Sequence, residues 1–323
     1  MECLSETDVA TLVDRDLALE AVEAVFMAMD AGEADAFPVV REPIGYQEAL
    51  YGFKSGFDRN AMTLGVKVGG YWPRNGDRGL ASHQSTVLLV APETGQCNAL
   101  VAGNHLTALR TAAAAASSIR HLAPAGARVL GILGAGHQAS WQLEAALDIG
   151  AFTEVLAWNR RPERTQALEA IAERRGCSFR PVSLPELGEA SDVIITITSS
   201  FAPLLEDVHV VGPTHIAAMG TDTEGKQELD PVLVARARCF AELPSQSARL
   251  GECQHAVGEG LMAESEIASL GGVIAERVPG RKASELTLFD GSGVGLQDLS
   301  LARAALERAR VRGMGQRLDL TSE

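Results

Sequence analysis

The sequence has few cysteines, no long apolar run and no excess of positive charge. Its five cysteines lie far apart and form no Cys-x-x-Cys pair, which indicates neither a zinc site nor a disulfide framework. No apolar run approaches the roughly 18 residues of a membrane-spanning helix, and the N-terminus is acidic where a secretion signal is basic. We therefore expect a cytoplasmic protein with no membrane partner.

The balance of charge is strongly acidic. Acidic residues outnumber basic ones 42 to 28, which gives a formal net charge of −14. Nucleic acids and anionic membrane surfaces are bound by clustered positive charge, so neither is an expected partner. Basic residues gathered around an anionic small molecule would be local exceptions.

The first third of the chain mixes helix and sheet patterns. Apolar spacing of three and four residues predicts a helix over 6–31, and short β-prone runs separated by turns predict an antiparallel or mixed sheet over 36–102. The alanine-rich segment 106–123 predicts a further helix. A chain of 323 residues exceeds one ordinary domain, so we expect two. We take 123–127, after this helix, as the linker between them.

The rest of the chain alternates continuous apolar strands with helices, which is typical of a parallel sheet covered on both faces. A last helix, at about 295–311, follows the final strand and can return to the N-terminal domain. We therefore predict one domain from 1–122 with 295–323, and a second over 123–294. The predicted strands of the second domain are 128–134, 154–159, 178–182, 192–198, 214–220, 238–243 and 287–293.

A glycine turn follows the first of these strands and opens a helix. The pattern is G-x-G-x-x-A, in which Gly134 permits a tight turn and Ala139 allows close helix packing. Free backbone N–H groups and the helix dipole then face a pyrophosphate. The fold class is thus α/β, with a Rossmann-type doubly wound parallel sheet plus a discontinuous α+β domain for substrate binding and dimerisation. The expected dinucleotide contacts here are Gly134, Ala135, Gly136, His137 and Gln138.

The end of the second strand distinguishes NAD from NADP, because an acid there accepts hydrogen bonds from the ribose and repels a 2′-phosphate. This sequence has Asn159, Arg160 and Arg161 instead. Two arginines could hold a 2′-phosphate, so the local chemistry permits NADP. Alternatively, both arginines lie over the adenine or in solvent.

Further cofactor contacts are expected at the carboxyl ends of two later strands, where an open α/β sheet binds its ligand. Hydroxyl groups follow one of these strands and a Met-Gly pair ends the other. The alternative for the hydroxyls is that they cap a local turn. The expected residues are Thr196, Thr198, Ser199, Met219 and Gly220.

Three segments together, TGQCNALVAGNHLTALRTAAAAA, GAGHQA and GTDTEGKQEL, resemble the ornithine cyclodeaminase/mu-crystallin family over essentially the whole chain. The resemblance implies a homodimer, with the substrate pocket and the dimer contact on the N-terminal domain. Known members include amino-acid cyclodeaminases, alanine dehydrogenases and imine reductases, all of which transfer hydride at an amino-acid α-carbon.

The resemblance also implies functional residues. The family's clamp for the substrate α-carboxylate matches Arg41, Lys67 and Arg110. Its catalytic positions match Asp222 and Lys67, the latter with its charge close to the reacting centre. A guanidinium grips a carboxylate in two places, and a carboxylate beside an iminium nitrogen stabilises the cation or exchanges a proton with it. The alternatives are solvated surface cations and a turn aspartate, although burial of Lys67 or Arg110 without an anion would be costly.

One position departs from the cyclodeaminases. Where they carry an acid for the distal amino group of the substrate, between the positions of Arg41 and Lys67, this sequence has Lys54. That change favours a second carboxylate and repels a distal ammonium. Alternatively, Lys54 points to solvent. Further neutral donors near this region are Tyr46, Tyr51, His83 and Ser85.

The segments YGFKSGFDR, GGYWP, HQST, GECQHA and LFDGSGVGLQD resemble the imine reductases of the family, which implies reduction of iminosuccinate, an imino dicarboxylic acid, to L-aspartate. This resemblance implies NADH as the donor, with NADPH tolerated. Other family chemistries stay open: alanine dehydrogenation, reduction of pyrroline-2-carboxylate, ornithine cyclodeamination, or NADP binding without turnover.

Two further groups receive no catalytic role. Glu252 and His255 are two potential ligands, too few for a metal site, and hydride transfer to an iminium needs no metal. Asp298 is expected either to contact the nicotinamide amide or to cap the last helix.

Overall fold

The computed structural model describes residues 1–283 and 285–319. The chain divides into two compact units: unit 1 is Met1–Arg110 with Val294–Glu323, and unit 2 is Thr111–Gly293. The predicted C-terminal segment extended to 320–323, which lie outside the described residues. The first division falls inside helix α3 (Asn104–Leu122), earlier than the linker expected at 123–127.

Helix α3 is shared because its two halves bond to different partners. Thr107, in its first half, accepts a hydrogen bond from a lysine of the unit 1 sheet. Ser118, in its second half, lies 3.1 Å from the ring nitrogen of His215 in unit 2. The alanine run that predicted the helix carries no sign of this change of partner.

Unit 1 is built on an eight-stranded mixed sheet in the order β18-β1-β7-β6-β5-β4-β2, with β3 also paired to β4. The β1–β7 pair is parallel and the remaining pairs are antiparallel. The strands are β1 (Glu2–Leu4), β2 (Ala34–Ala36), β3 (Val40–Pro43), β4 (Leu50–Asp58), β5 (Thr63–Tyr71), β6 (His83–Val90), β7 (Cys97–Ala102) and β18 (Gln316–Arg317).

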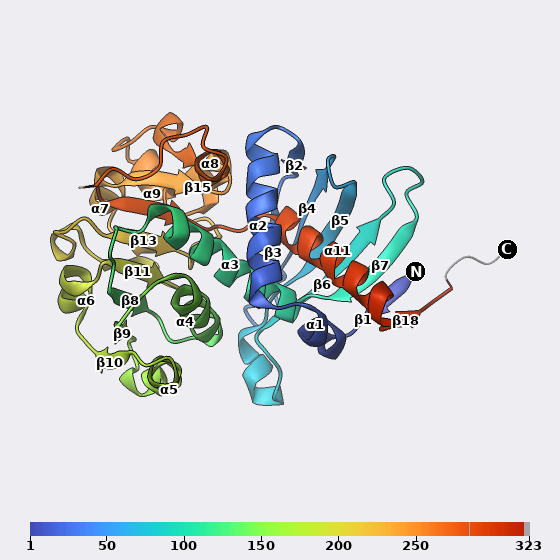
Figure 1. The fold of residues 1–323 in the computed structure, drawn as a ribbon, viewed down its shortest axis with the longest axis horizontal. Coiled ribbons are helices and arrows are strands. Elements are labelled where there is room, and N and C mark those ends of the chain that lie inside the picture. Colours follow the sequence, from blue (N-terminus) through green and yellow to red (C-terminus); the bar gives the residue numbers. More distant parts are fainter. Residues whose placement is uncertain (284, 320–323) are drawn as a thin grey trace. The chain divides into compact units, whose positions relative to one another are not determined.

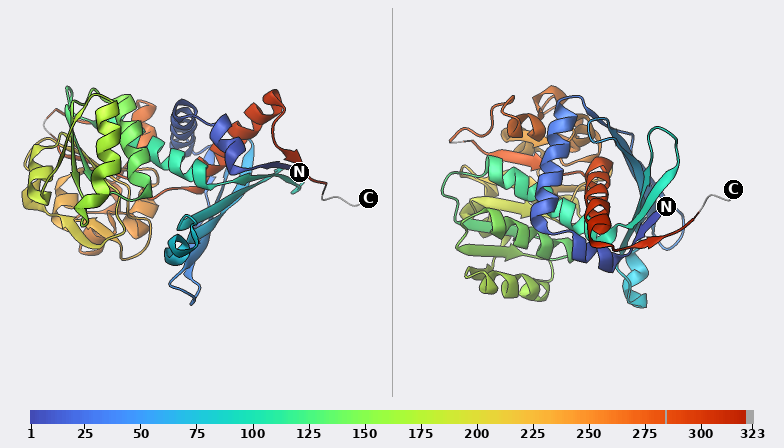
Figure 2. Two further views of the ribbon diagram at one scale, coloured as in Figure 1. Left: turned by 90° about the horizontal axis from the view of Figure 1, so that it is seen from below. Right: turned by 45° about the vertical axis from the view of Figure 1, so that its right-hand side comes forward.

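Two helices from opposite ends of the chain cover this sheet. Helix α11 (Gly295–Arg312) packs on β4, β5 and β6, and α2 (Arg15–Asp30) packs beside α11. Figure 1 shows the two helices next to each other, and Figure 2 shows α11 against the strands from a second direction. The residues after the last strand of unit 2 thus complete the core of unit 1.

The prediction of a single helix over 6–31 is wrong, because the structure has two helices in this segment. Helix α1 (Glu6–Leu12) ends at Val13, which is extended, and α2 begins after Asp14. The Asp14 carboxylate accepts the backbone N–H of Leu17 at 2.8 Å, which makes Asp14 an N-cap. The apolar spacing continues across the break, so periodicity alone does not reveal it.

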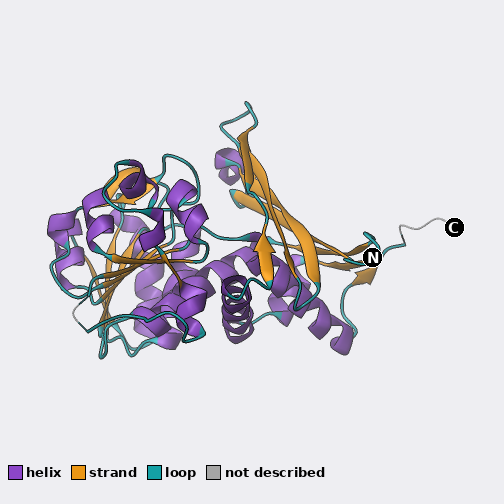
Figure 3. Cartoon of the chain, turned by 90° about the horizontal axis from the view of Figure 1, so that it is seen from above, coloured by secondary structure: helices purple, strands orange, loops and turns teal. Residues whose placement is uncertain are grey.

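Unit 2 contains an eight-stranded sheet in the order β10-β9-β8-β11-β13-β17-β15-β16, with every pair parallel. Helices flank it on both faces (Figure 3), so the doubly wound Rossmann-type fold is confirmed. The strands are β8 (Val129–Leu133), β9 (Glu154–Trp158), β10 (Ser178–Pro181), β11 (Val193–Thr196), β13 (His215–Ala218), β15 (Arg238–Ala241), β16 (Ala268–Ser269) and β17 (Thr287–Asp290).

The predicted strands of unit 2 all appear, and the structure adds β16 and a two-stranded sheet of β12 (Phe201–Leu205) and β14 (Gln227–Leu229). Strands β14 and β16 are too short to leave an apolar run, and the apolar segment of β12 contains Pro203, a residue that disfavours the interior of a strand. The helices of this unit are α4 (His137–Ile149), α5 (Gln166–Arg174), α6 (Leu184–Ala190), α7 (Pro231–Arg236), α8 (Pro244–Leu250), α9 (Gln254–Gly258) and α10 (Leu270–Ile274).

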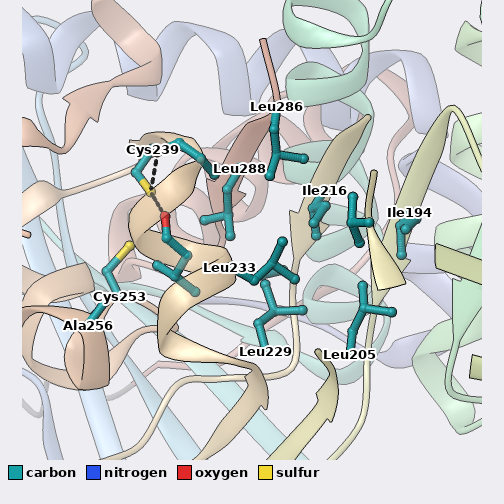
Figure 4. Packing of buried hydrophobic residues seen from close by; sticks show 14 of the residues in the cluster. Ile194, Leu205, Ile216, Leu229, Leu233, Cys239, Cys253, Ala256, Leu286 and Leu288 are labelled. Carbon is teal, nitrogen blue, oxygen red and sulfur yellow. Dashed lines mark hydrogen bonds between the residues drawn. The ribbon is translucent and has the colours of Figure 1, made fainter. Parts of the chain in front are cut away.

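The core of unit 2 fixes the strands whose carboxyl ends carry the candidate residues. Ile194 of β11, Ile216 of β13 and Leu288 of β17 are fully buried and pack with Leu233 of α7 (Figure 4). Burying one such side chain contributes about 1.5–3 kcal/mol. Cys239 and Cys253 fill the same cluster as small apolar side chains. Among the described residues, no helix combines the length and apolar character needed to cross a membrane.

Candidate active site

A cluster of cations lies on the face of the unit 1 sheet that α11 covers. Lys54 of β4 pairs directly with Lys67 of β5. Arg41 of β3 lies in the adjacent row, which continues through two glycines to Ser85 of β6. Directly opposed residues in an antiparallel pair share a face, and so do residues two apart along a strand. Arg41, Lys54 and Lys67 therefore project from the same side.

Lys67 is buried in this cluster. Its ammonium donates hydrogen bonds to the Thr107 hydroxyl at 2.6 Å and to Oδ1 of Asp298 at 3.0 Å. Burial lowers the pKa of Lys67 to about 8, even though the Asp298 carboxylate favours the charged form. Lys67 therefore carries its charge at neutral pH and loses it as the pH rises through about 8.

Arg110 reaches the same carboxylate from α3. Its Nε lies 3.4 Å from Oδ2 of Asp298, and its Nη1 donates to Oε1 of Gln297 at 3.2 Å. Asp298 is fully buried. Burial alone would raise its pKa, but the charges of Arg110 and Lys67 outweigh burial and hold the pKa below its usual range. Asp298 is thus an ionised carboxylate between two buried cations.

Two neutral groups complete the cluster. Burial, followed by the charges of Lys67 and Arg110, lowers the pKa of His83 to about 3, so its imidazole is neutral. The Ser85 hydroxyl lies 3.3 Å from the Thr107 hydroxyl. The predicted donor Tyr51 is on the opposite face from Lys54, because side chains alternate along a strand.

The described contacts gather four cations around Asp298. Lys67 and Arg110 contact its carboxylate, Lys54 also influences the pKa of Asp298, and Arg41 influences the pKa of Lys67. Like charges directly opposed across a sheet destabilise it. An anion with more than one carboxylate would relieve this repulsion.

In unit 2 the glycine turn lies between β8 and α4, where the strand order reverses between β8 and β11. Gly134 has φ of +119°, and a Cβ there would lie 2.6 Å from the carbonyl oxygen of Ile197. Gly136 is the exposed N-cap of α4, has no side-chain cap, and has open space where a Cβ would be. This geometry fits the pyrophosphate of a dinucleotide.

The remaining residues expected near a dinucleotide differ in exposure. Ala135 and Gln138 are partly buried, and His137 is exposed. Beyond β9, Asn159 is partly buried, whereas Arg160 and Arg161 are exposed. Ser199 is exposed, Thr198 is partly buried and Met219 is buried.

Thr196 is engaged inside the domain. It is fully buried and its hydroxyl donates to Oε2 of Glu228 at 2.7 Å. Glu228 also accepts the backbone N–H groups of Thr198 at 2.6 Å and Gly220 at 2.9 Å. One buried carboxylate therefore ties the end of β11 to the end of β13.

Asp222 lies in the loop between β13 and β14. Its Oδ1 accepts a hydrogen bond from Lys226 Nζ at 2.9 Å. Glu252 accepts the backbone N–H groups of Glu228 and Leu229 at 2.8 and 2.7 Å. Burial and the neighbouring Glu228 raise the pKa of Glu252 to about 8.

The contacts of Glu252 and His255 fasten this loop. Glu252 also accepts the hydroxyl of Thr221, and the Nε2 atom of His255 lies 3.1 Å from the carbonyl oxygen of Lys226. Within residues 1–283 and 285–319, no group of three His, Cys, Asp or Glu side chains is placed to hold a metal ion.

Sequence reasoning missed the supporting carboxylates. Asp298 was expected to cap a helix or to contact the nicotinamide, whereas it pairs with Lys67 and Arg110. Glu228 and Glu252 received no such role. The available signal was an acid inside an apolar pattern: Asp298 in GLQDLSLA and Glu228 in a buried strand.

We predict that Asp298→Asn destabilises the protein by about 3 kcal/mol, because the variant leaves buried Lys67 and Arg110 without their countercharge. Differential scanning calorimetry should show an unfolding temperature several degrees lower. The matched control is Asp16→Asn, at an exposed position of α2, which should leave the unfolding temperature unchanged. Equal unfolding temperatures for the two variants would contradict the structural role of Asp298.

Comparison with known proteins identifies relatives of the whole chain. The family profile described as ornithine cyclodeaminase/mu-crystallin matches residues 1–313. The iminosuccinate reductase of Paracoccus denitrificans (strain Pd 1222) is 53% identical over 320 residues, which cover 99% of this chain and 100% of the relative.

Solved structures agree in fold. The crystal structure of the Paracoccus denitrificans iminosuccinate reductase in complex with NAD+ aligns with a TM-score of 0.95 at 53% identity, covering 99% of each chain. An archaeal alanine dehydrogenase dimer with bound NAD aligns with a TM-score of 0.93 at 30% identity, also covering 99% of each chain. The sequence match, the glycine turn and the shared fold establish that this chain belongs to the ornithine cyclodeaminase/mu-crystallin family.

Proposed function

We propose that this chain is an NAD-dependent iminosuccinate reductase, which transfers hydride to C2 of iminosuccinate and forms L-aspartate. The observation that carries the substrate assignment is the pairing of Lys54 with Lys67 on one sheet face. The 53% identity to an iminosuccinate reductase supports the same reaction.

The unit 1 cluster is suited to a substrate with two carboxylates. In this proposal Arg41, Lys67 and Arg110 bind the α-carboxylate, and Lys54 binds the distal one. The proposal follows from charge, because cyclodeaminases of the family carry an acid near the position where this chain has Lys54. The charge of Lys54 reaches the cluster: after Arg110 and Lys67, it contributes to lowering the pKa of Asp298. A distal ammonium would be repelled by this face.

The nitrogen of the imine is assigned to Asp222. A carboxylate beside a protonated imine stabilises its positive charge, which makes C2 a better hydride acceptor. Asp222 matches the catalytic aspartate of the family by its place in GTDTEGKQEL. Family members that only bind ligands often lack an aspartate at this position, so Asp222 favours turnover.

NADH supplies the hydride when it is bound. We assign its pyrophosphate to the turn of Gly134, Ala135 and Gly136, whose geometry admits the phosphates. Thr196 supports this site through Glu228. We assign Arg160 and Arg161 to the 2′-phosphate of NADPH, and the remaining contacts of either dinucleotide to His137, Gln138, Asn159, Thr198, Ser199, Met219 and Gly220.

We also infer a homodimer in the cytoplasm. An archaeal alanine dehydrogenase relative is a dimer with bound NAD. The five cysteines of this chain are unpaired in the structure, which fits a reducing compartment.

Oxaloacetate with ammonia, which form iminosuccinate in solution, should support NADH oxidation well above a pyruvate-plus-ammonia control. Lys54→Met should lower kcat/KM for the dicarboxylate by about ten- to a hundredfold, the loss expected for a hydrogen bond to a charged group. Its activity with pyruvate plus ammonia should change little.

The control for this experiment is Lys282→Met, at an exposed lysine of unit 2, which should match the wild type. If the wild type oxidises NADH no faster with oxaloacetate than with pyruvate, the dicarboxylate assignment is wrong. If the wild type prefers oxaloacetate but Lys54→Met retains the wild-type kcat/KM for it, the reaction stands and Lys54 does not bind the distal carboxylate.

Arg160 and Arg161 are predicted to allow NADPH as a second donor, because no acid at the end of β9 repels its 2′-phosphate. The double variant Arg160→Ala with Arg161→Ala should lose at least about tenfold in kcat/KM for NADPH, the loss of a charged hydrogen bond. Its kcat/KM for NADH should stay near that of the wild type.

Arg164→Ala, at an exposed arginine a few residues farther on, is the matched control and should affect neither donor. Equal losses for NADH and NADPH in the double variant would show that the arginines do not recognise the 2′-phosphate.

A further inference from the structure

Lys226 forms an ion pair with Asp222 that the proposed reaction does not yet use. Lys226 Nζ donates to Oδ1 of Asp222 at 2.9 Å, and both side chains are partly shielded, at 17% and 27% exposed. The same ammonium donates to the carbonyl oxygen of Gly220 at 3.3 Å. The cation therefore has two acceptors, one of them in the backbone, and its position relative to Asp222 is fixed.

The loop that carries both residues is held by contacts that do not involve the Lys226 ammonium. The backbone N–H of Gly220 is bound by Glu228, and the hydroxyl of Thr221 by Glu252. Gln254 accepts the N–H of Gly225 at 2.8 Å and donates to the Thr223 carbonyl oxygen at 3.3 Å. Removing the ammonium should leave this loop in place.

The ion pair favours the ionised form of Asp222. A positive charge in direct contact stabilises an ionised carboxylate more than a neutral one. Among the contacts of the described residues, Glu228, Glu252 and His255 bind the backbone of the loop or Thr221. Lys226 is the cation bonded to Asp222 in the described contacts.

We propose that Lys226 is a positioning residue that keeps Asp222 an ionised, oriented carboxylate, so that Asp222 stabilises the iminium and does not donate a proton to it. This inference rests on the proposed reduction of an imine. The imine then arrives already protonated. Hydride adds to C2, the C=N π electrons move to nitrogen, and the neutral amine takes one proton from water while Asp222 stays ionised.

The test compares Lys226→Met, Lys226→Arg and wild type, each as the full chain. The first measurement is the ratio of variant to wild-type kcat at each pH, since the ratio cancels the pH dependence of imine formation. For Lys226→Met we expect a ratio of about one tenth at neutral pH, as for a misplaced reacting group. The ratio should rise with pH. The acid limb of the kcat profile of Lys226→Met should lie about one pH unit above that of the wild type.

Lys226→Arg should restore the position of the acid limb, because it restores the cation. Lys282→Met is the matched control and should follow the wild type at every pH. NADH affinity, measured by fluorescence, should be the same in all four proteins, which separates a change at Asp222 from a general loss of structure.

The second measurement does not depend on turnover. The protein is labelled with carboxyl-¹³C aspartate and its carboxyl signals are followed by NMR. The signal that is absent from the spectrum of Asp222→Asn is assigned to Asp222. Its titration should move to higher pH in Lys226→Met and return in Lys226→Arg. An unchanged Asp222 titration in Lys226→Met would overturn the proposal, as would a kcat ratio that does not vary with pH.

The two proposals fail in different ways. A wild type that cannot reduce iminosuccinate contradicts the proposed function, whereas the titration of Asp222 still reports on Lys226. A wild type that is active, with Asp222 titrating identically in Lys226→Met, contradicts only the role of Lys226.

Discussion

The contact between Asp298 and the two cations Lys67 and Arg110 is the constraint on which the unit 1 site depends. All three side chains are buried, and a buried charge is tolerated only when it is paired. The contact joins β5, α3 and α11, so the end of the chain must return to the first unit. The discontinuity of unit 1 and the burial of these cations are therefore linked by the same interaction.

Unit 2 also contains buried carboxylates, which bind hydroxyl and backbone N–H groups rather than cations. Glu228 joins the ends of β11 and β13, and Glu252 holds the following loop by its backbone. Burial raises the pKa of each, and hydrogen bonds from hydroxyl and N–H groups partly offset that effect. Their acceptor oxygens bind backbone N–H groups and the hydroxyls of Thr196 and Thr221, and so hold the loop that carries Asp222. Rigid support of this kind is what an electrostatic catalyst requires.

From the sequence we could predict the elements that are marked by a repeating apolar pattern or by a local motif. Continuous apolar runs predicted the seven parallel strands of unit 2, and the glycine turn located the switch point. Apolar periodicity missed the break before α2, although the N-cap Asp14 is a local signal for it. Features set by distant contacts were missed as well: the sharing of α3 between units and the partners of Asp298. The register that pairs Lys54 with Lys67 is set by the β4–β5 hairpin, whose strands are joined by the turn 59–62. Because side chains alternate along β4, Tyr51 lies on the other face. The distant contacts and this register do not follow from a window of neighbouring residues.

The central claim is that a protonated Lys67, within a face of several cations, binds a dicarboxylate. Calorimetric titration with succinate, which lacks the imine and cannot react, tests it most directly. The account predicts tight binding at neutral pH that weakens as the pH rises through about 8, with proton uptake on binding near that pH, because the anion favours charged Lys67. Succinate affinity that stays constant through this range, or that equals the affinity of the monocarboxylate propionate, would contradict it.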